Sequence, residues 1–296
     1  MRRACPSTSL GANGGFGNHD AGSTMKIAVC APARPIDPIV EPRLKALAAI
    51  TFPEVEIVFH PQCFLEDGHF AGSDAVRAAA FLDFANDPAF DAIWFARGGY
   101  GSNRILHAVM PQLGPAAAHK QYLGYSDMGF LLAALYARRI GRPAHGSMPS
   151  EVSRKDDQAH DVMRSLAWLV RGDRAGLEPS LDGRPAAAFN LSILNALIGT
   201  PWLPDLTDHV LMIEEVSEPL YRIDRMLSQM AHATQLKGIA GVRLGRITDV
   251  QPNVPEFGET PEQMIARWCG EMGVPYLGRA DIAHDAQNKV VPFGVA

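Results

Sequence analysis

Residues 120–135, KQYLGYSDMGFLLAAL, place a small hydroxyl between two runs of different character. The aromatic and aliphatic residues before Ser126 indicate a strand, and the Leu- and Ala-rich residues after it indicate a helix. Ser126 can cap that helix, because a serine oxygen at this position accepts an orphan backbone N–H. It can also be a nucleophile, since a strand–turn–helix junction presents a side chain near the positive end of a helix dipole. This stretch alone favours the cap and leaves the nucleophile open.

The alternation of strand-like and helical runs continues on both sides of this junction. Strand-like runs rich in Val, Ile and aromatic residues alternate with helical runs. The strand-like runs are residues 26–33, 55–60, 92–99 and 121–126. The helical runs are residues 41–50, 73–85, 102–110 and 128–139. This alternation predicts βαβ units on a mostly parallel sheet with helices on both faces. We therefore expect an α/β domain of flavodoxin-like or amidotransferase-like type over residues 25–150, with ligands bound at the carboxyl ends of its strands.

The rest of the chain predicts a linking segment and a second, smaller α/β domain. Residues 151–184 combine a charged amphipathic helix with a turn-rich stretch, and strand and helix patterns resume over 185–296. In this second domain Thr260 and Gln263 form a capping-box pattern at the start of a helix. Residues 1–24 are rich in Gly, Ser and Asn, so we interpret them as a disordered tail before the first strand.

Composition limits the class of protein. A chain of 296 residues is longer than one core comfortably supports, which favours two domains. Its net charge of −5 provides no basic face for nucleic acid. The four cysteines lack C-x-x-C spacing, as is usual in a reducing compartment. There is no apolar signal-peptide segment and no run of about 18 apolar residues. We therefore expect a cytoplasmic protein without membrane contact.

A glycine-rich loop, RGGYGSNR at residues 97–104, follows the predicted strand AIWFA. Gly99 and Gly101 resemble part of a dinucleotide-binding fingerprint, but Arg104 stands where the third glycine belongs and the loop follows the third strand. A nucleotide site is therefore disfavoured. Two interpretations remain. The segment is either a plain tight turn or a loop whose backbone N–H groups approach a developing oxyanion. Ser126, on the next strand, would then lie beside the loop.

Two neighbouring glutamates end the predicted strand HVLMIEEV. Because side chains alternate along a strand, Glu214 and Glu215 point to opposite faces, and at most one of them faces a given site. Paired-carboxylate glycosidase chemistry is therefore poorly supported.

The histidines offer one weak metal pattern and two candidate bases. His60, Cys63 and His69 lack a fourth ligand and match no common zinc spacing, so no metal site is expected. His145 ends the strand after the Ser126 helix, and His284 lies in a polar loop before the final strand. Either imidazole can serve as a general base or be a surface or supporting histidine.

Five motifs in sequence make the chain resemble the LD-carboxypeptidase family, serine peptidases of the muramoyltetrapeptide carboxypeptidase type. They are ARGGYGSNRIL (96–106), LGYSD (123–127), NLSILNALIGTPWLP (190–204), LMIEEVSEPLYRIDRML (211–227) and LGRADIAHDAQNKVVPFG (277–294). The resemblance implies Ser126 as nucleophile, His284 as general base and Glu214 as the carboxylate that orients the imidazole, meeting between two domains. These types suit the chemistry, because serine needs a base and a carboxylate fixes the tautomer of that base. An α/β-hydrolase elbow would require glycine where Met128 stands.

Further groups are expected around this triad, because the glycine loop and the start of the helix after Ser126 can converge there. The N–H groups of Gly99 and Asp127 are the expected oxyanion donors. Arg97, Tyr100 and Asn190 are expected to contact the substrate, and no metal or organic cofactor is required. An exopeptidase must hold a free carboxylate, for which an arginine fork is suited. The candidates for this fork, which the sequence does not rank, are Arg97, Arg104, Arg222 and Arg225.

The implied function is removal of a terminal D-amino acid, D-alanine, from an L,D-linked murein tetrapeptide during cell-wall recycling, by a homodimeric enzyme. The family commonly has two glycines before the asparagine that matches Asn190, whereas this chain has Ala188 and Phe189. This departure keeps open an immunity-type peptidase that cleaves a peptide-nucleotide antibiotic. A catalytically silent α/β protein that binds amino acids or nucleotides is a third possibility.

Overall fold

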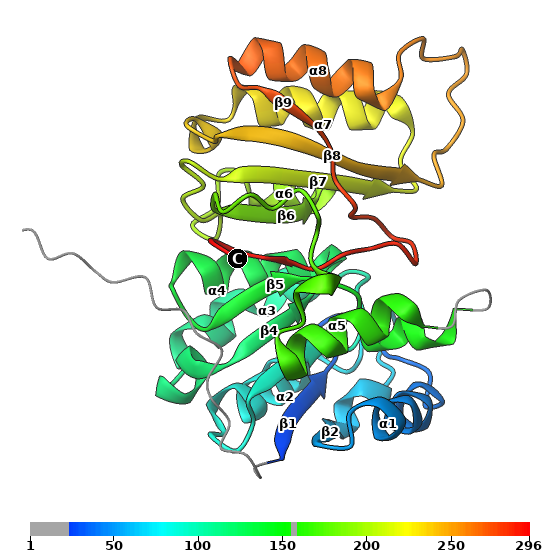
Figure 1. The fold of residues 1–296 in the computed structure, drawn as a ribbon, viewed down its shortest axis with the longest axis vertical. Helices are drawn as coiled ribbons and strands as arrows, with labels where there is room; N and C mark the ends of the chain where they lie inside the picture. The colour runs from blue at the N-terminus through cyan, green and yellow to red at the C-terminus, as the bar shows by residue number, and fades with distance from the viewer. Residues whose placement is uncertain (1–23, 155–158) are drawn as a thin grey trace, which may run out of the picture.

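The computed structural model describes residues 24–154 and 159–296. They form two sheets stacked one above the other, each with its own helices (Figure 1). The predicted tail, residues 1–24, lies outside the described residues apart from Thr24, so its disorder stays a prediction. The predicted α/β class with a mostly parallel sheet and a second, smaller sheet is confirmed.

The first sheet has six strands in the order β10-β5-β4-β3-β1-β2. Strands β1 to β5 are parallel and in the 2-1-3-4-5 order of flavodoxin-like folds, while β10 is antiparallel at the edge. The strands are β1 (Met25–Cys30), β2 (Val55–Phe59), β3 (Ala92–Phe95), β4 (Gln121–Gly124), β5 (Arg142–His145) and β10 (Val291–Pro292). The helices of this half are α1 (Val40–Thr51), α2 (Asp74–Asn86), α3 (Ser102–Val109), α4 (Gly129–Ala137) and α5 (His160–Arg171).

Both faces of this sheet are buried, because its strands are apolar at successive positions. Ile27 and Trp94 point to the face covered by α1 and α5, whereas Ala28 and Phe95 point to the face covered by α2, α3 and α4. Continuous apolar strands of this kind are typical of parallel sheets with helices on both sides. This burial explains why the strand and helix runs were readable from sequence.

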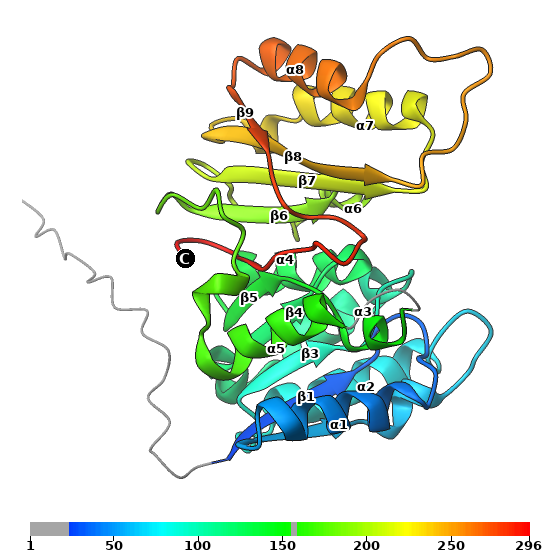
Figure 2. The ribbon, with the colours of Figure 1, turned by 45° about the vertical axis from the view of Figure 1, so that its right-hand side comes forward.

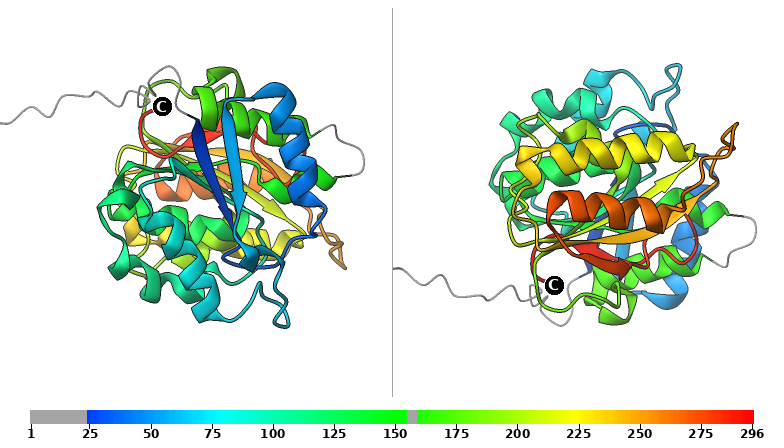
Figure 3. Two further views of the ribbon diagram at one scale, coloured as in Figure 1. Left: turned by 90° about the horizontal axis from the view of Figure 1, so that it is seen from below. Right: turned by 90° about the horizontal axis from the view of Figure 1, so that it is seen from above.

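The second sheet has the order β6-β7-β8-β9 and is wholly parallel. Its strands are β6 (Ala186–Asn190), β7 (Val210–Val216), β8 (Gly241–Thr248) and β9 (Tyr276–Arg279), and its helices are α6 (Leu191–Leu197), α7 (Leu220–His232) and α8 (Pro261–Met272). Figure 3 shows α7 and α8 side by side across the top of this sheet. The predicted capping box at α8 is confirmed: Thr260 Oγ1 accepts from Gln263 N at 3.3 Å, and Gln263 Oε1 accepts from Thr260 N at 2.8 Å.

The end of the chain returns to the first sheet (Figure 2). After β9 it crosses the face of the second sheet, and β10 then pairs with β5, with Val291 opposite His145. Gly294 also exchanges two backbone hydrogen bonds with Ala186 of β6, each at 2.9 Å. The last strand therefore joins both halves, although the sequence placed it wholly within the 185–296 domain. A strand of two residues is too short to show the alternating hydrophobic pattern by which strands are recognised in a sequence.

The helix of the linking segment is shorter than the sequence predicted. A 3-10 turn, η5 (Pro149–Ser153), precedes α5, which begins at His160, and residues 155–158 lie outside the described part of the chain. None of the described helices combines the length and apolarity needed to cross a bilayer.

The buried aromatic cluster of the first half is a direct test of this packing. Phe81 is fully buried and its ring lies 6.0 Å from that of Phe95 and 6.3 Å from that of Tyr122. Phe81→Ala is expected to lower the free energy of unfolding by about 3–5 kcal/mol in urea denaturation, because it leaves a cavity. Ile50→Ala, at a site that is 83% exposed, is the control and should change it by less than about 0.5 kcal/mol. Equal effects of the two variants would contradict the described core.

Candidate active site

The turn after β4 holds Ser126 in a strained backbone conformation. Ser126 has a φ of +59°, in the left-handed region that non-glycine residues rarely adopt, and it opens the 3-10 turn η4 (Ser126–Met128) that leads into α4. Such a conformation costs about 1–2 kcal/mol and persists only where the surroundings determine it. The strain favours a functional role for Ser126 over a simple helix cap, and no side-chain cap bond from the preceding residue is formed at this turn.

Asp127 fixes one side of this turn. Its buried carboxylate accepts the backbone N–H groups of Ser102 at 2.9 Å and of Gly101 at 3.3 Å, and the Ser102 hydroxyl donates to the Asp127 carbonyl at 2.6 Å. Burial raises the pKa of Asp127 to about 6, although these hydrogen bonds oppose the rise. The side chain therefore caps α3 from a neighbouring element, a role that the sequence did not reveal.

Tyr125 holds the other side of the turn that carries Ser126. Its buried hydroxyl donates to Glu151, and its ring centroid lies 4.8 Å from that of His284 and 5.3 Å from that of His145. Burial raises the pKa of Glu151 to about 7, with Arg154 acting in the opposite direction. Both neighbours of Ser126 are thus held by buried polar contacts, which accounts for the persistence of the strained turn.

His284 and Glu214 form a buried pair. Glu214 is wholly buried on β7, and its Oε2 lies 2.7 Å from His284 Nδ1. This contact directs Nε2 of the imidazole away from the carboxylate. Burial lowers the pKa of His284, but the charge and hydrogen bond of Glu214, with Glu151, outweigh it and raise the pKa above its ordinary value. Glu215 points the other way, as its position predicted, and accepts from Asn190 and Ser192.

The loop that carries His284 is held in place by residues that no sequence pattern indicates. Arg246 of β8 makes a bidentate contact with Asp285 at 2.6 and 2.7 Å. Gly245, also on β8, leaves room for this loop, because a Cβ there would lie 2.5 Å from the Ile282 carbonyl oxygen and 2.9 Å from Glu214 Cβ. The loop and the carboxylate therefore share one closely packed site on β8.

Asn288 joins this loop to the first sheet. Its Oδ1 accepts from Ala283 N at 3.1 Å and lies 2.9 Å from His145 Nε2, while its amide donates to Ser147 Oγ at 3.3 Å. His145 is almost wholly buried, and burial lowers its pKa to about 4. Of the two candidate bases, His145 thus supports the loop, and His284 reaches the pocket described next.

Ser126 and His284 share one pocket of about 250 Å³ at the carboxyl ends of the first sheet's strands. No hydrogen bond joins these two described side chains, as is common in sites without substrate. The lining residues are Arg97, Gly98, Gly99, Tyr125, Ser126, Met148, Ser150, Glu151, Arg154 and His284.

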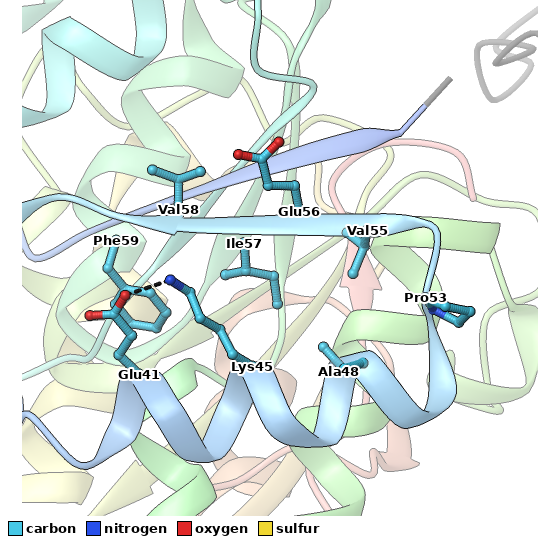
Figure 4. A pocket seen from close by; sticks show the side chains of 10 residues that line it. Glu41, Lys45, Ala48, Pro53, Val55, Glu56, Ile57, Val58 and Phe59 are labelled. Carbon is cyan, nitrogen blue, oxygen red and sulfur yellow. Dashed lines mark hydrogen bonds and ion pairs between the residues drawn. The ribbon is translucent and has the colours of Figure 1, made fainter. Parts of the chain in front are cut away.

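A second hollow, of about 600 Å³, lies between α1 and β2 (Figure 4). It carries the Glu41–Lys45 pair but no histidine or hydroxyl, so it is not a candidate site for acyl transfer.

The glycine loop lies directly against Ser126. A Cβ at Gly98 would be 2.9 Å from both Cβ and Oγ of Ser126, and one at Gly99 would be 2.5 Å from Arg34 Cδ. Gly99 also has a φ of +115°, a conformation that side chains disfavour. The backbone of this loop can therefore approach a carbonyl at Ser126, which supports the prediction that Gly99 and Asp127 donate to an oxyanion.

The predicted substrate residues divide into those at the pocket and those away from it. Arg97 lines the pocket and donates to the Pro35 carbonyl at 3.2 Å; burial and the neighbouring Arg34 lower its pKa. Tyr100 lies outside the lining. Asn190 is buried, with Nδ2 donating to Glu215 at 2.7 Å and Oδ1 accepting from Ile193 N at 3.3 Å, so its amide supports β6 and α6.

The other predicted arginines bind elsewhere. Arg104 pairs with Asp74, Arg222 pairs with Glu218, and the guanidinium of Arg225 lies over the Tyr221 ring. None of the three lines the pocket.

A different arginine, Arg154, does line the pocket, and it contacts Glu151 at 2.9 Å and Asp161 at 2.5 Å. The sequence did not indicate Arg154 because it stands in a charged run that predicts an amphipathic linking helix.

The remaining candidates have structural partners. His60 Nδ1 accepts from Gln62 N, Cys63 Sγ donates to the Val29 carbonyl, and His69 packs on Phe70. Within residues 24–154 and 159–296 no three metal-ligating side chains converge.

Phe189 does not narrow the pocket, since it is buried on β6 against Phe293, with ring centroids 5.2 Å apart. The departure at Ala188 and Phe189 therefore lies in the buried cores on the two faces of β6.

Comparison with family models covers both halves of the chain. The model of the LD-carboxypeptidase N-terminal domain matches residues 27–146, and that of the C-terminal domain matches residues 186–296. The chain belongs to the LD-carboxypeptidase family. The resemblance seen in the sequence motifs is thereby confirmed.

Relatives within the LD-carboxypeptidase family extend over most of the chain. A putative carboxypeptidase of Streptomyces coelicolor is 32% identical over 283 residues, covering 91% of this chain and 88% of the relative. A murein tetrapeptide carboxypeptidase of Pseudomonas aeruginosa is 28% identical, covering 76% of this chain and 78% of the relative.

Solved structures show the same fold. Muramoyltetrapeptide carboxypeptidase from Oxalobacter formigenes has a TM-score of 0.76 at 22% identity, covering 90% of this chain and 93% of that one. The microcin C7 self-immunity protein MccF, in complex with aspartyl sulfamoyl adenosine, has a TM-score of 0.75 at 17% identity, covering 92% of each chain.

The Glu214–His284 pair predicts the direction of a pH effect. If His284 is the general base it must be neutral to act, so the rate should fall as pH drops through its pKa, which Glu214 raises above the ordinary histidine value. Glu214→Gln removes the neighbouring charge and should lower that pKa, moving the acid limb to lower pH, while kcat falls about 10⁴-fold. NMR titration of the His284 ring measures the shift independently of activity. Glu262→Gln, in the first turn of α8, is the control. An unchanged His284 pKa in Glu214→Gln would contradict the pairing.

The contact between Gly98 and Ser126 gives a second prediction. Gly98→Ala puts a methyl group against the Ser126 hydroxyl and is expected to lower kcat/KM by about 10²-fold through misplacement of the nucleophile. Gly270→Ala is the matched control, because a Cβ at this α8 position meets nothing within 4 Å. It should retain activity and gain about 0.5–1 kcal/mol in stability. Wild-type activity in Gly98→Ala would show that the loop does not lie against the reacting hydroxyl.

Proposed function

We propose that the chain is a serine carboxypeptidase that hydrolyses the L,D-peptide bond holding the terminal D-alanine of murein tetrapeptides. The observation that carries this proposal is the placement of a strained Ser126 and of His284, paired with buried Glu214, on one pocket. These are the groups that acyl transfer through a serine ester requires. A cytoplasmic role in cell-wall recycling and a homodimeric assembly remain predictions from the sequence.

The reaction follows from the positions of these groups. Ser126 Oγ attacks the carbonyl carbon while His284 Nε2 accepts its proton, and Glu214 stabilises the imidazolium that forms. Collapse of the tetrahedral intermediate breaks the C–N bond, and His284 gives its proton to the leaving amine. Water, with His284 again as base, then hydrolyses the ester and restores Ser126. The N–H groups of Gly99 and Asp127 are the proposed donors to the oxyanion in both steps.

Arg97 is the proposed ligand of the substrate's terminal carboxylate. It lines the pocket with Ser126, whereas Arg104, Arg222 and Arg225 do not. Its guanidinium is partly buried, so an arriving carboxylate would meet it where water screens the charges less. The preference for a murein tetrapeptide is drawn from the relatives, among them the murein tetrapeptide carboxypeptidase of Pseudomonas aeruginosa.

The direct test is release of D-alanine from murein tetrapeptide by the purified protein. Wild type is expected to release it with or without EDTA, because no step in the proposed mechanism uses a metal. Ser126→Ala should lower kcat by at least about 10⁴-fold, since the whole triad depends on the nucleophile. Chromatographic detection of D-alanine measures both.

The alternatives correspond to other outcomes. Folded wild type that leaves murein tetrapeptide intact would contradict the proposal, and a peptide-nucleotide substrate would be tested next. The likeness to MccF concerns the fold alone and does not favour that substrate. Failure on both substrate classes, with bound amino acid or nucleotide after purification, would indicate the silent binding protein instead.

A further inference from the structure

A second carboxylate, that of Glu151, lines the same pocket as Ser126 and His284. Glu151 belongs to the 3-10 turn η5 and is almost wholly buried, with 8% of its surface exposed. Its Oε2 accepts from the backbone N–H of Met148 at 3.0 Å, and its Oε1 accepts from the Tyr125 hydroxyl. The proposed reaction at Ser126 gives this carboxylate no role. Burying a carboxylate is costly, so its place beside the reacting groups indicates a function.

The Tyr125 ring connects Glu151 to the imidazole. Its centroid lies 4.8 Å from that of His284, and its hydroxyl is bound by Glu151. Tyr125 is buried, and breaking a buried hydrogen bond is unfavourable, so Glu151 keeps the ring against the imidazole. His284 is thus held at Nδ1 by Glu214 and at its ring by Tyr125.

The acidic groups around Glu151 outnumber the basic ones. Arg154 contacts Glu151 at 2.9 Å and Asp161 at 2.5 Å, so one guanidinium serves two buried carboxylates. Asp161 is fully buried, and its Oδ1 has no hydrogen-bond partner among the described residues. Burial raises the pKa of Glu151 to about 7; the charge of Asp161 adds to this rise, and Arg154 opposes it. The cluster of Glu151, Arg154 and Asp161 therefore has an excess of negative charge.

This negative charge acts on the group that becomes positive in the proposed reaction. Burial lowers the pKa of His284, whereas the charges of Glu214, Glu151 and Glu215 raise it. Glu214 acts through a hydrogen bond of 2.7 Å, and Glu151 acts from the wall of the shared pocket. The neighbouring His145 does not oppose them, because burial lowers its pKa to about 4 and leaves it neutral at pH 7. A carboxylate stabilises an imidazolium more strongly where water is partly excluded.

We propose that Glu151 is a second positioning residue for His284, which holds the imidazole through Tyr125 and stabilises its protonated form by charge. This inference rests on the proposed function at Ser126. It makes the strength of the base depend on two carboxylates from different halves of the chain, Glu214 of β7 and Glu151 of η5. Because the pKa of Glu151 is about 7, its charge is fully present well above pH 7 and is lost as the pH falls through that value.

The test combines NMR titration of the His284 ring with the pH profile of kcat on murein tetrapeptide. Glu151→Gln removes the charge with little change of shape and should lower the pKa of His284. The acid limb of the profile should then move to lower pH. The plateau value of kcat should fall about tenfold, because a weaker base accepts the Ser126 proton less readily. A purely structural role of Glu151 would lower kcat without moving the pKa of His284.

Two further variants separate the charge of Glu151 from its shape. Glu151→Asp keeps the charge, so the pKa of His284 should stay closer to the wild-type value than in Glu151→Gln. Asp161→Asn removes the acid that competes for Arg154, so Glu151 should ionise at lower pH and the pKa of His284 should rise. Asp161→Asn leaves Glu151 and Tyr125 in place, so it tests the inference even if Glu151→Gln does not fold.

The matched control is Glu218→Gln, since Glu218 forms a similar carboxylate–arginine pair, with Arg222 at 3.0 Å, outside the pocket lining. It should leave the pKa of His284 at the wild-type value. An unchanged pKa of His284 in folded Glu151→Gln, or a lowered one in Asp161→Asn, would overturn the inference and leave the proposed function intact. Folded wild type that does not cleave murein tetrapeptide would refute the proposed function, and the inference with it.

Discussion

A carboxylate buried inside a sheet must find a hydrogen-bond donor, and Glu214 finds it in His284. This one contact sets requirements for much of the second half of the chain. The loop after β9 has to press against β8, which Gly245 permits, and Arg246 has to hold it there through Asp285. The chain must then return to the first sheet as β10, where Asn288 binds beside His145. The imidazole thereby lines the same pocket as Ser126, the proposed nucleophile on the other half.

Strain at Ser126 is the counterpart of this contact in the first half. A left-handed serine is stable only if its neighbours cannot relax, and here both are held by buried polar groups: Asp127 by the start of α3, and Tyr125 by Glu151. The Asp127 carboxylate also ties the turn that carries Ser126 to the glycine loop. The two proposed oxyanion donors, Gly99 and Asp127, thus belong to segments joined by hydrogen bonds, so their spacing is set before substrate arrives.

The sequence predicted the parts of this structure that leave a repeating signal. Alternating strand and helix runs gave the α/β class, because buried strands such as AIWF and amphipathic helices have recognisable patterns. Other features depend on residues far apart in the chain and leave no local pattern. They are the pairing of β10 with β5 and the supporting roles of Asn288 and Arg154. Asn190 was expected to face substrate, yet its amide is bound by Glu215 and the start of α6. A motif identifies a position, whereas side-chain direction depends on tertiary contacts.

We propose that His284, oriented by Glu214, activates Ser126 as a nucleophile. The most direct measurement is to treat the protein with a fluorophosphonate at neutral pH and locate the adduct by peptide mass spectrometry. One covalent phosphonyl group on Ser126 is expected in wild type, and labelling should be much slower in His284→Ala. Modification of a different residue, or labelling of Ser126 at the same rate without the imidazole, would contradict it.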